Sequence, residues 1–388
     1  MLRLLHTADV HLGARHTDLG DGATALRERR FGAFRAAIDL AVAEKVDLFL
    51  VAGDLFDSNT QPRRSVDRVA AELRRLVEAR IRTVLIPGTH DVYDRASIYR
   101  AHDLPALSGS TPDDDWVTLL TPERPEVHLA TLDTVVYSQV FATKRAPHSP
   151  LIGMEAAADD RATFKIGVIH GAIMIPGVVE HDEVIVTTDE IAKSGLDYLA
   201  FGHWHSVQQG RAGHTTWAYS GAPEPVALDQ DKAGNVLLVT LDGAATRKTV
   251  TVEERRVGRT RFEVLELDVA TLGSQPALVD RLRAMADADL VLDVRLDGLR
   301  PDELDISPDE VEAQLRGSFF RLRVRDRSVP PLTEGALPPP DTVAGAFIRD
   351  LEGRVAELEA ADRPGEAAEL RDALRLGRLL LSGHEVTL

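Results

Sequence analysis

Acidic and histidine residues follow five short apolar segments of the sequence. The five motifs are Asp9-Val10-His11, Gly53-Asp54, Gly88-Thr89-His90-Asp91, His170 and Gly202-His203-Trp204-His205. Each apolar segment is a predicted β-strand, and ligands of α/β sheets bind at the carboxyl ends of strands. Residues that are far apart in the sequence can therefore converge. One such motif is common by chance, but five of them at strand ends predict a shared site.

Two of the motifs place their polar side chains at alternate positions. In an extended segment, Asp9 and His11 point to the same side, as do His203 and His205, so each pair can bind one cation. Asp54 follows a glycine that permits close backbone approach, and a carboxylate there can bridge two cations. Two divalent ions about 3.5–4 Å apart can activate a water and stabilise the attacking and leaving oxygens of phosphoryl transfer. The pattern predicts a metal-dependent phosphoesterase.

Histidines at two other motifs have different expected roles. His90, backed by Asp91, is predicted to lie near the cations without binding them, as a proton donor or a group that stabilises the transition state. His170 follows the apolar run 165–169. An isolated histidine there is more often a hydrogen-bonded core residue, but its place among the five motifs favours a metal ligand.

The composition limits the kind of metal site and of partner. The chain has no cysteine, so its metal ligands must be His, Asp, Glu, Asn or hydroxyl groups, which favours manganese or magnesium and permits zinc or iron. The formal net charge of −17 argues against nucleic-acid binding through a global basic field but not through a local one. The arginine-rich segment 27–30 is either such a local surface or a solvated helix face. With no apolar run of roughly 18 residues and no signal-peptide core, we expect a cytoplasmic protein and no membrane partner.

The elements that must position the motifs alternate between strands and helices over the first 240 residues. Apolar residues at spacings of three and four predict helices over 26–45 and 64–80, and Thr187 with Glu190 predicts a capping box for a further short helix. The predicted strands are 2–6, 47–52, 83–87, 165–169 and 198–201, followed by 216–219, 236–241 and 246–253. We expect a layered α/β domain with a mixed, two-layered sheet core.

The sequence changes character after about residue 260. Strands at 262–269 and 290–296, with a helix near 276–286, predict a small α+β module. Two amphipathic helices follow a proline-rich segment. A hairpin of such helices with an exposed apolar face binds a partner, and packing on its own chain is an equally open alternative. The predicted parts are a catalytic domain at 1–258, a capping domain at 259–328, a linker at 329–341 and a helical segment at 342–388.

The five motifs together resemble those of the calcineurin-like metallophosphoesterases. Two segments, 5–13 and 219–225, are similar to the SbcD-type DNA-repair nuclease subunits within that family. The resemblance is specific over roughly residues 1–240. It implies a four-layer α/β/β/α domain with two manganese ions, a small α+β capping domain that helps to position DNA, and C-terminal helices. It further implies a homodimer that works with an SMC-like coiled-coil ATPase, which the C-terminal helices bind.

The same resemblance implies a role for each motif residue. One ion is bound by Asp9, His11, Asp54 and His205, and the other by Asp54, Thr89, His170 and His203, with His90 in the catalytic role. One position departs from the family, whose third motif normally reads Gly-Asn-His-Asp/Glu, because this chain has Thr89 in place of the asparagine. A threonine hydroxyl is shorter and a poorer neutral ligand. The second ion is therefore expected to bind weakly, through water, or not at all.

Three functions are compatible with these patterns. The first is a metal-dependent DNA exonuclease or endonuclease in repair and recombination, which the module after residue 260 and the terminal helices favour. The second is a phosphodiesterase or phosphatase that acts on small substrates. The third is a weakly catalytic scaffold for the ATPase, in which Thr89 marks decay of the site.

Overall fold

The chain divides into two compact units, Met1–Thr260 and Arg261–Leu388. The computed structural model describes residues 1–14, 22–111, 113–152, 154, 162–175, 177, 179, 181–225, 230, 232–244, 247–301, 303–329 and 338–381. Among these residues, no helix is both long and apolar enough to cross a membrane.

The first unit contains two six-stranded sheets. The first sheet has the spatial order β14 (Arg247–Arg256), β13 (Asn235–Ala244), β1 (Leu2–Thr7), β2 (Leu48–Ala52), β3 (Arg82–Ile86) and β4 (Val117–Leu119). β1 to β4 are parallel, whereas β13 is antiparallel to β1 and to β14. The carboxyl ends of β1, β2 and β3, where three of the motifs begin, therefore share one edge.

The second sheet carries the other two motifs. Its order is β11 (Gln208–Ala212), β12 (Thr215–Tyr219), β10 (Tyr198–Gly202), β7 (Phe164–His170), β6 (Thr134–Tyr137) and β5 (Glu126–Leu129). β7 and β10 are parallel neighbours, and Gly202 is paired with His170. The shorter elements nearby are β8 (Ala172–Ile173), β9 (Ile185–Val186) and the 3-10 helix η2 (Ala130–Leu132).

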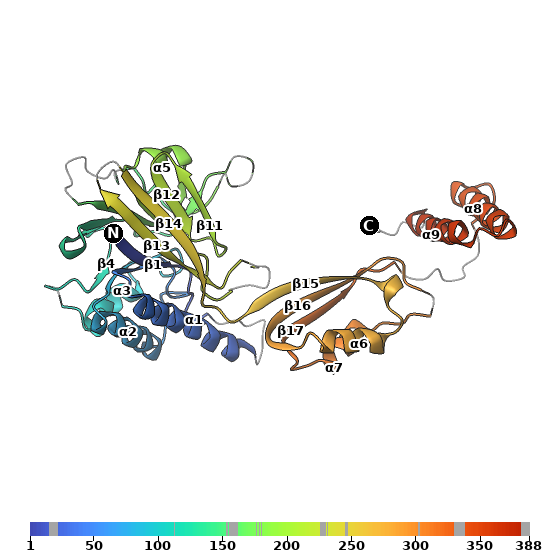
Figure 1. Cartoon of the computed structure of the whole chain (residues 1–388), viewed down its shortest axis with the longest axis horizontal. Helices are drawn as coiled ribbons and strands as arrows, with labels where there is room; N and C mark the ends of the chain where they lie inside the picture. The colour runs from blue at the N-terminus through green and yellow to red at the C-terminus, as the bar shows by residue number, and fades with distance from the viewer. Residues whose placement is uncertain are drawn as a thin grey trace. The chain divides into compact units, whose positions relative to one another are not determined.

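Helices cover the outer face of each sheet (Figure 1). The first sheet is covered by α1 (Gly22–Glu44) and α2 (Arg63–Glu78), with the short α3 (Ile98–Ala101) and α4 (Leu104–Leu107), and the second by α5 (Thr188–Lys193). Within β2, Phe49 and Val51 pack toward the helices, whereas Leu48 and Leu50 pack between the sheets. Because alternate side chains of a strand point to opposite faces, a strand between two layers is apolar throughout. The predicted four-layer α/β/β/α class is confirmed.

The second unit begins with a three-stranded parallel sheet of β15 (Arg261–Asp268), β16 (Asp287–Asp297) and β17 (Phe319–Asp326). The 3-10 helix η3 (Val269–Thr271) follows β15, and α6 (Gln275–Arg283) and α7 (Pro308–Gln314) cover one face of the sheet (Figure 1). Neither α7 nor β17 was expected from the sequence. Arginines at alternate positions of β17 weaken its apolar signal.

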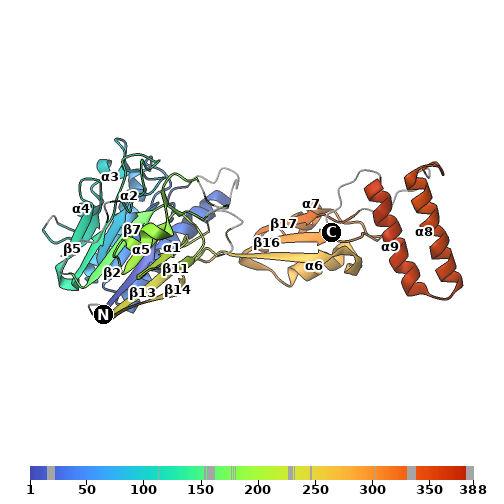
Figure 2. The ribbon, with the colours of Figure 1, turned by 90° about the horizontal axis from the view of Figure 1, so that it is seen from above.

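Two antiparallel helices, α8 (Val343–Ala360) and α9 (Pro364–Leu381), form a hairpin in which the helices lie side by side (Figure 2). Ile348, Val355 and Ala367 are buried, and the Phe347 ring occupies the space where Gly377 has no side chain. Most of the predicted linker at 329–341 lies outside the described residues, because 330–337 are not among them.

Candidate metal centre

The structure brings most of the predicted metal ligands together at the shared strand ends of the first unit. Within the described residues, three groups of possible ligand atoms lie within 4.8 Å of one another: Asp9 with His11 and His205, Asp9 with Asp54 and His170, and His11 with Asp57 and His90. The first two groups combine residues from the two sheets, whereas the third comes from the strand ends of the first sheet alone.

Asp54 lies at the centre of this cluster. Its Oδ2 is 3.2 Å from Nε2 of His170 and 3.7 Å from Nε2 of His11. Its Oδ1 accepts a hydrogen bond of 2.7 Å from the backbone N–H of His90. A carboxylate between two imidazole groups has the position that bridging of two cations requires.

Around Asp9, the donor atoms of two histidines face each other. Nε2 of His11 and Nε2 of His205 are 3.3 Å apart, and they lie 4.0 and 3.9 Å from Oδ1 of Asp9. The other ring nitrogens have different neighbours, because Nδ1 of His11 lies 3.3 Å from Oδ1 of Asp57 and Nδ1 of His205 lies 2.6 Å from the Gln230 amide. Such neighbours orient the rings and leave each Nε2 for a cation.

The backbone is strained at several of the ligands, and close packing around them maintains this conformation. Asp9, His11, Asp54 and His203 all have positive φ, between 49° and 102°, a region that costs free energy for non-glycine residues and recurs at functional sites. Gly53 has φ 88°, and a Cβ there would lie 2.4 Å from Nδ1 of His170. Glycine is therefore required for the approach of β2 to the His170 ring.

His170 and His203 form the second half of the site. Nδ1 of His170 donates to the Ala52 carbonyl at 2.9 Å, which directs Nε2 toward Asp54. The His203 ring centre is 5.4 Å from that of His170, but Nε2 of His203 lies 3.0 Å from Oδ2 of Asp182. His203 is in none of the three groups of ligand atoms, so its role as a ligand stays a prediction. The same holds for Thr89, which is 7% exposed and lines a small cavity with His170.

His90 and Asp91 have separate environments. His90 is exposed, its Nδ1 lies 3.1 Å from the Asp57 carbonyl, and its ring centre is 4.6 Å from that of His11. Asp91 is fully buried and accepts hydrogen bonds from the hydroxyl of Tyr99 at 2.6 Å and from the backbone N–H groups of Gly88 and Phe56. The Asp91 carboxylate thus holds the turn that carries His90, and the His90 ring is not one of these partners.

Charges at the centre are strongly coupled. Burial alone would raise the pKa of Asp54, but His170, His11 and His90 outweigh it and hold that pKa well below its ordinary value. Burial alone would lower the pKa of His170, but Asp54 and Asp9 outweigh it and raise that pKa to about 10. A buried carboxylate that stays ionised beside several imidazoles suits a divalent cation, which replaces the imidazole protons as the balancing charge.

Four residues near the site were not predicted from the sequence. Asp57 follows Asp54 by three positions, a short spacing that could have drawn attention to it, whereas Asp182 and Gln230 lie in loops with no comparable signal. Arg30 belongs to the segment considered as a basic surface, but it is buried and its guanidinium donates to the His11 carbonyl at 3.3 Å. Burial lowers the pKa of Arg30 to about 10 in spite of Asp57 and Glu224. Arg30 therefore supports the site from behind rather than offering a phosphate contact.

The residues present fit two divalent cations. The cluster offers carboxylate oxygens and imidazole nitrogens and no sulfur, which is the donor set of manganese, zinc or iron sites. The adjacent Nε2 atoms of His11 and His205 point toward each other and need a positive partner. The fold and this site define a metal-dependent hydrolase of phosphate esters.

Comparison with known families agrees with this class. Residues 2–207 match the family described as "Calcineurin-like phosphoesterase", which is more than half of the chain. The chain therefore belongs to the calcineurin-like phosphoesterase family.

Three curated relatives illustrate the similarity. The "Uncharacterized metallophosphoesterase YhaO" of Bacillus subtilis is 28% identical over 295 residues, 71% of this chain and 65% of that protein. The "DNA double-strand break repair protein Mre11" of Aeropyrum pernix is 28% identical over 288 residues, 72% of this chain and 67% of that protein. A relative in Rhodobacter capsulatus, named as one of the subunits of the nuclease SbcCD, is 26% identical over 290 residues, 63% of this chain and 68% of that protein. The chain spans about two thirds of the length of each.

Proposed function

We propose that this protein is a DNA nuclease subunit that hydrolyses phosphodiester bonds with two divalent cations, Mn²⁺ being the proposed metal. The observation that carries the proposal is the position of Asp54, whose carboxylate lies within 4 Å of imidazoles from both sheets. Bound cations would supply an activated water and stabilise the charge of the phosphoryl oxygens. The names of the Mre11 and SbcCD relatives support DNA as the substrate.

His90 is the proposed proton donor or transition-state stabiliser. Its Nδ1 is held by the Asp57 carbonyl and its backbone N–H by Asp54. This leaves Nε2 of an exposed ring for the substrate. Asp91 acts on the reaction by holding the turn, so we propose it as a positioning residue.

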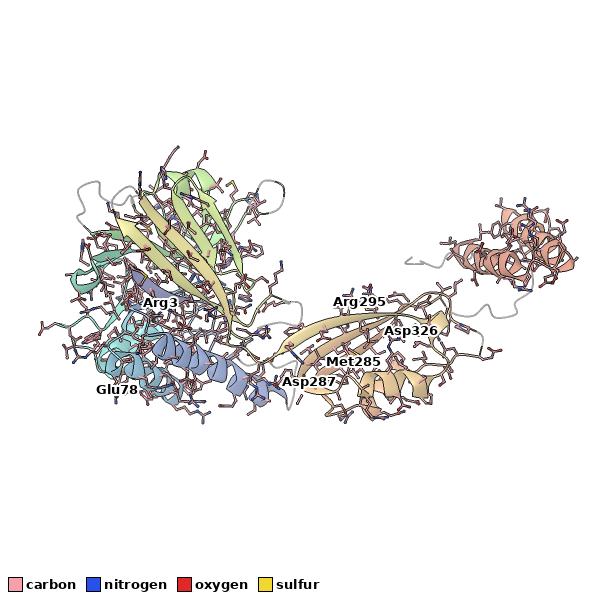
Figure 3. The ribbon with its side chains drawn as sticks, in the orientation of Figure 1. Arg3, Glu78, Met285, Asp287, Arg295 and Asp326 are labelled. Atoms are coloured by element: carbon pink, nitrogen blue, oxygen red, sulfur yellow. The ribbon has the colours of Figure 1, made fainter. Side chains whose placement is uncertain are left out.

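Arginines on the open face of the β15–β17 sheet support a nucleic acid over a small ester. The register of the strands places Arg321, Arg323 and Arg325 of β17 beside Val291, Asp293 and Arg295 of β16. Leu322 and Val324, between these arginines, belong to the core that α6 and α7 cover. The arginines therefore lie on the opposite face, which Figure 3 shows for Arg295.

Arg321 and Arg323 are available for phosphate groups, whereas Arg295 and Arg325 are already paired. Arg295 and Arg325 form ion pairs with Asp293 at 3.3 and 3.0 Å. Within the described part of the chain, the guanidinium groups of Arg321 and Arg323 form no hydrogen bond or ion pair; the two residues are paired with β16 through their backbones. Arginine binds phosphate oxygens through a planar, bidentate group. A local basic surface of this kind is compatible with the overall acidity, and the second unit is proposed to position DNA.

The α8–α9 hairpin is the proposed binding site for an SMC-like coiled-coil ATPase. Val343 and Leu380 are 79% and 53% exposed although both are apolar. One relative is named as a subunit of a nuclease, which supports a partner for this chain. The homodimer and the cytoplasmic location expected from the sequence belong to the same proposal.

The test is cleavage by the purified full-length chain in Mn²⁺. The substrates are labelled duplex DNA, labelled single-stranded DNA and bis-p-nitrophenyl phosphate. His90→Gln is expected to lose about a hundredfold or more in rate, as removal of a general acid does. The matched control is His128→Gln, because His128 is exposed on β5 and its ring lies beside Glu126 rather than beside the metal ligands. Cleavage of the small ester without any cleavage of DNA would favour a small-substrate enzyme, and cleavage of neither would favour a scaffold.

A second variant separates DNA positioning from the chemistry. Arg321→Glu combined with Arg323→Glu is expected to raise KM for duplex DNA and to leave turnover of the small ester unchanged. An unchanged KM for DNA would remove the open sheet face from the proposal.

A further inference from the structure

A small cavity lies beside the second half of the metal centre. Its volume is about 30 Å³, and its lining includes Thr89, Gln139 and His170. A polar cavity needs about 10–15 Å³ to hold a water molecule. The cavity is therefore large enough for one water.

Strand pairing brings Gln139 to this cavity. β6 runs parallel to β7, with Tyr137 paired with Gly167. Gln139 lies two residues beyond the end of β6, and His170 lies three residues beyond Gly167. Gln139 is thus a further polar residue at the strand ends that build the metal centre.

The polar groups of Thr89 and Gln139 lack partners in the protein. Thr89 is buried and Gln139 is half-buried. Within the described part of the chain, neither the Thr89 hydroxyl nor the Gln139 amide forms a hydrogen bond. Buried polar groups in folded proteins are paired with protein atoms or with water. The polar atoms of Thr89 and Gln139 are not sealed from solvent, so a water in the cavity can form hydrogen bonds with both.

Lys144 also lines the cavity, but unlike Thr89 and Gln139 its polar group is charged and already paired. Its ammonium group is paired with Glu183 at 3.2 Å, and its side chain is 55% exposed. A fixed positive charge would also repel a second cation. Thr143 also lines the cavity, but its hydroxyl donates to the Arg145 carbonyl at 2.9 Å. The neutral side-chain oxygens left for this half of the site are therefore those of Thr89 and Gln139.

We propose that Gln139 completes the second cation site, by holding with Thr89 a water whose oxygen serves that cation as a neutral ligand. This inference rests on the proposed function only in assuming a second divalent cation near Asp54 and His170. Such ions prefer about six donors, largely oxygens. Asp54 and His170, even with His203, leave several positions to neutral ligands. Gln139 acts as a positioning residue, because it does not touch the substrate.

The experiment is a metal titration of the full-length chain, with no DNA and no turnover. Isothermal titration calorimetry gives the affinity for each Mn²⁺, and mass spectrometry of the native protein gives the stoichiometry. Gln139→Leu is expected to weaken the second Mn²⁺ by about tenfold to a hundredfold, the usual effect of losing a group that supports a metal ligand, and to leave the first unchanged. Gln139→Glu keeps an oxygen donor of the same length and is expected to retain both ions. Gln209→Leu, on exposed β11, is the matched control.

A double-mutant cycle separates this role from a structural one. Thr89→Asn extends the side chain into the cavity and is expected to tighten the second Mn²⁺ and to make Gln139 dispensable. Gln139→Leu should then have little effect in the Thr89→Asn background. Three results would overturn the inference. Gln139→Leu could weaken the second Mn²⁺ equally in the wild-type and Thr89→Asn backgrounds, it could weaken it in neither, or the wild-type chain could bind only one Mn²⁺. If Gln139→Leu leaves Mn²⁺ affinity unchanged while the wild-type chain cleaves DNA, this inference alone fails. If the wild-type chain binds no Mn²⁺, the proposed function fails as well.

Discussion

Gly53 is the position where one added methyl group should damage the metal centre most directly. In Gly53→Ala, the backbone must keep φ near 88°, which costs an L residue about 1–2 kcal/mol. The new Cβ would also lie 2.4 Å from Nδ1 and 2.8 Å from Cγ of His170. The ring of His170 must therefore move away from β2.

The cost of that movement can be estimated from the contacts of His170. Its Nδ1 would lose the hydrogen bond to the Ala52 carbonyl, which contributes about 1 kcal/mol. Together with the backbone term, we expect the free energy of unfolding to fall by about 2–3 kcal/mol. Since Nε2 of His170 would move relative to Asp54, we also expect Mn²⁺ affinity to fall by about tenfold to a hundredfold.

Tryptophan fluorescence during urea unfolding measures the stability term. All three tryptophans, at 116, 204 and 217, belong to the first unit, so the signal reports on that unit alone. Calorimetric titration with Mn²⁺ measures the affinity. Gly32→Ala is the control, because Gly32 lies in α1 with nothing within 4 Å of an added Cβ, and it should stabilise by about 0.5–1 kcal/mol. Wild-type stability and Mn²⁺ affinity in Gly53→Ala would refute the reasoning.

Three further predictions concern groups around the site. Tyr99→Phe removes the hydroxyl that donates to Asp91 at 2.6 Å; we expect a loss of about 1.5–3 kcal/mol and faster deuterium exchange at the Gly88 amide, and unchanged exchange there would contradict this. Asp182→Asn removes the charge beside Nε2 of His203, so calorimetry should show Mn²⁺ affinity reduced by about tenfold or more; equal affinity would mean that Asp182 does not orient a ligand. Burial lowers the pKa of His6 to about 3, so the unfolded chain binds a proton between about pH 6.5 and 3 that the folded chain does not, and stability falls as pH falls. His6→Gln should remove about 2 kcal/mol of this loss between pH 7 and 5 in urea titrations; parallel pH profiles of the two proteins would show that His6 is not the cause.

The predictable part of the structure is the part that local patterns encode. The apolar run of β2 and the three-and-four spacing of α1 and α2 follow from burial and helix geometry. Thr187 and Glu190 form the predicted capping box. β17 was missed because Arg321, Arg323 and Arg325 face away from the core, and alternation with charged residues hides a strand in a sheet that is covered on one face only.

Some residues of the candidate site could likewise be predicted from the sequence, and others could not. Asp9, His11 and His205 could be chosen in advance because each follows a strand, and strand ends of a parallel sheet meet at one edge. Asp182 lies in a loop, and Gln139 follows β6, a strand that was not predicted from the sequence. Each is a single polar residue whose importance depends on which strand or loop lies next to it, so no spacing along the chain could have selected it.

The sequence by itself determined the fold class and the chemical type of the site, because five polar motifs after buried strands permit few alternatives. Tertiary structure decided which of these polar residues lie next to one another at the metal centre. It placed Asp54 between the imidazoles of two sheets, separated Asp91 from the His90 ring, and put Thr89 and Gln139 around one cavity. These outcomes depend on strand order and register between segments far apart in the chain, which local patterns do not encode.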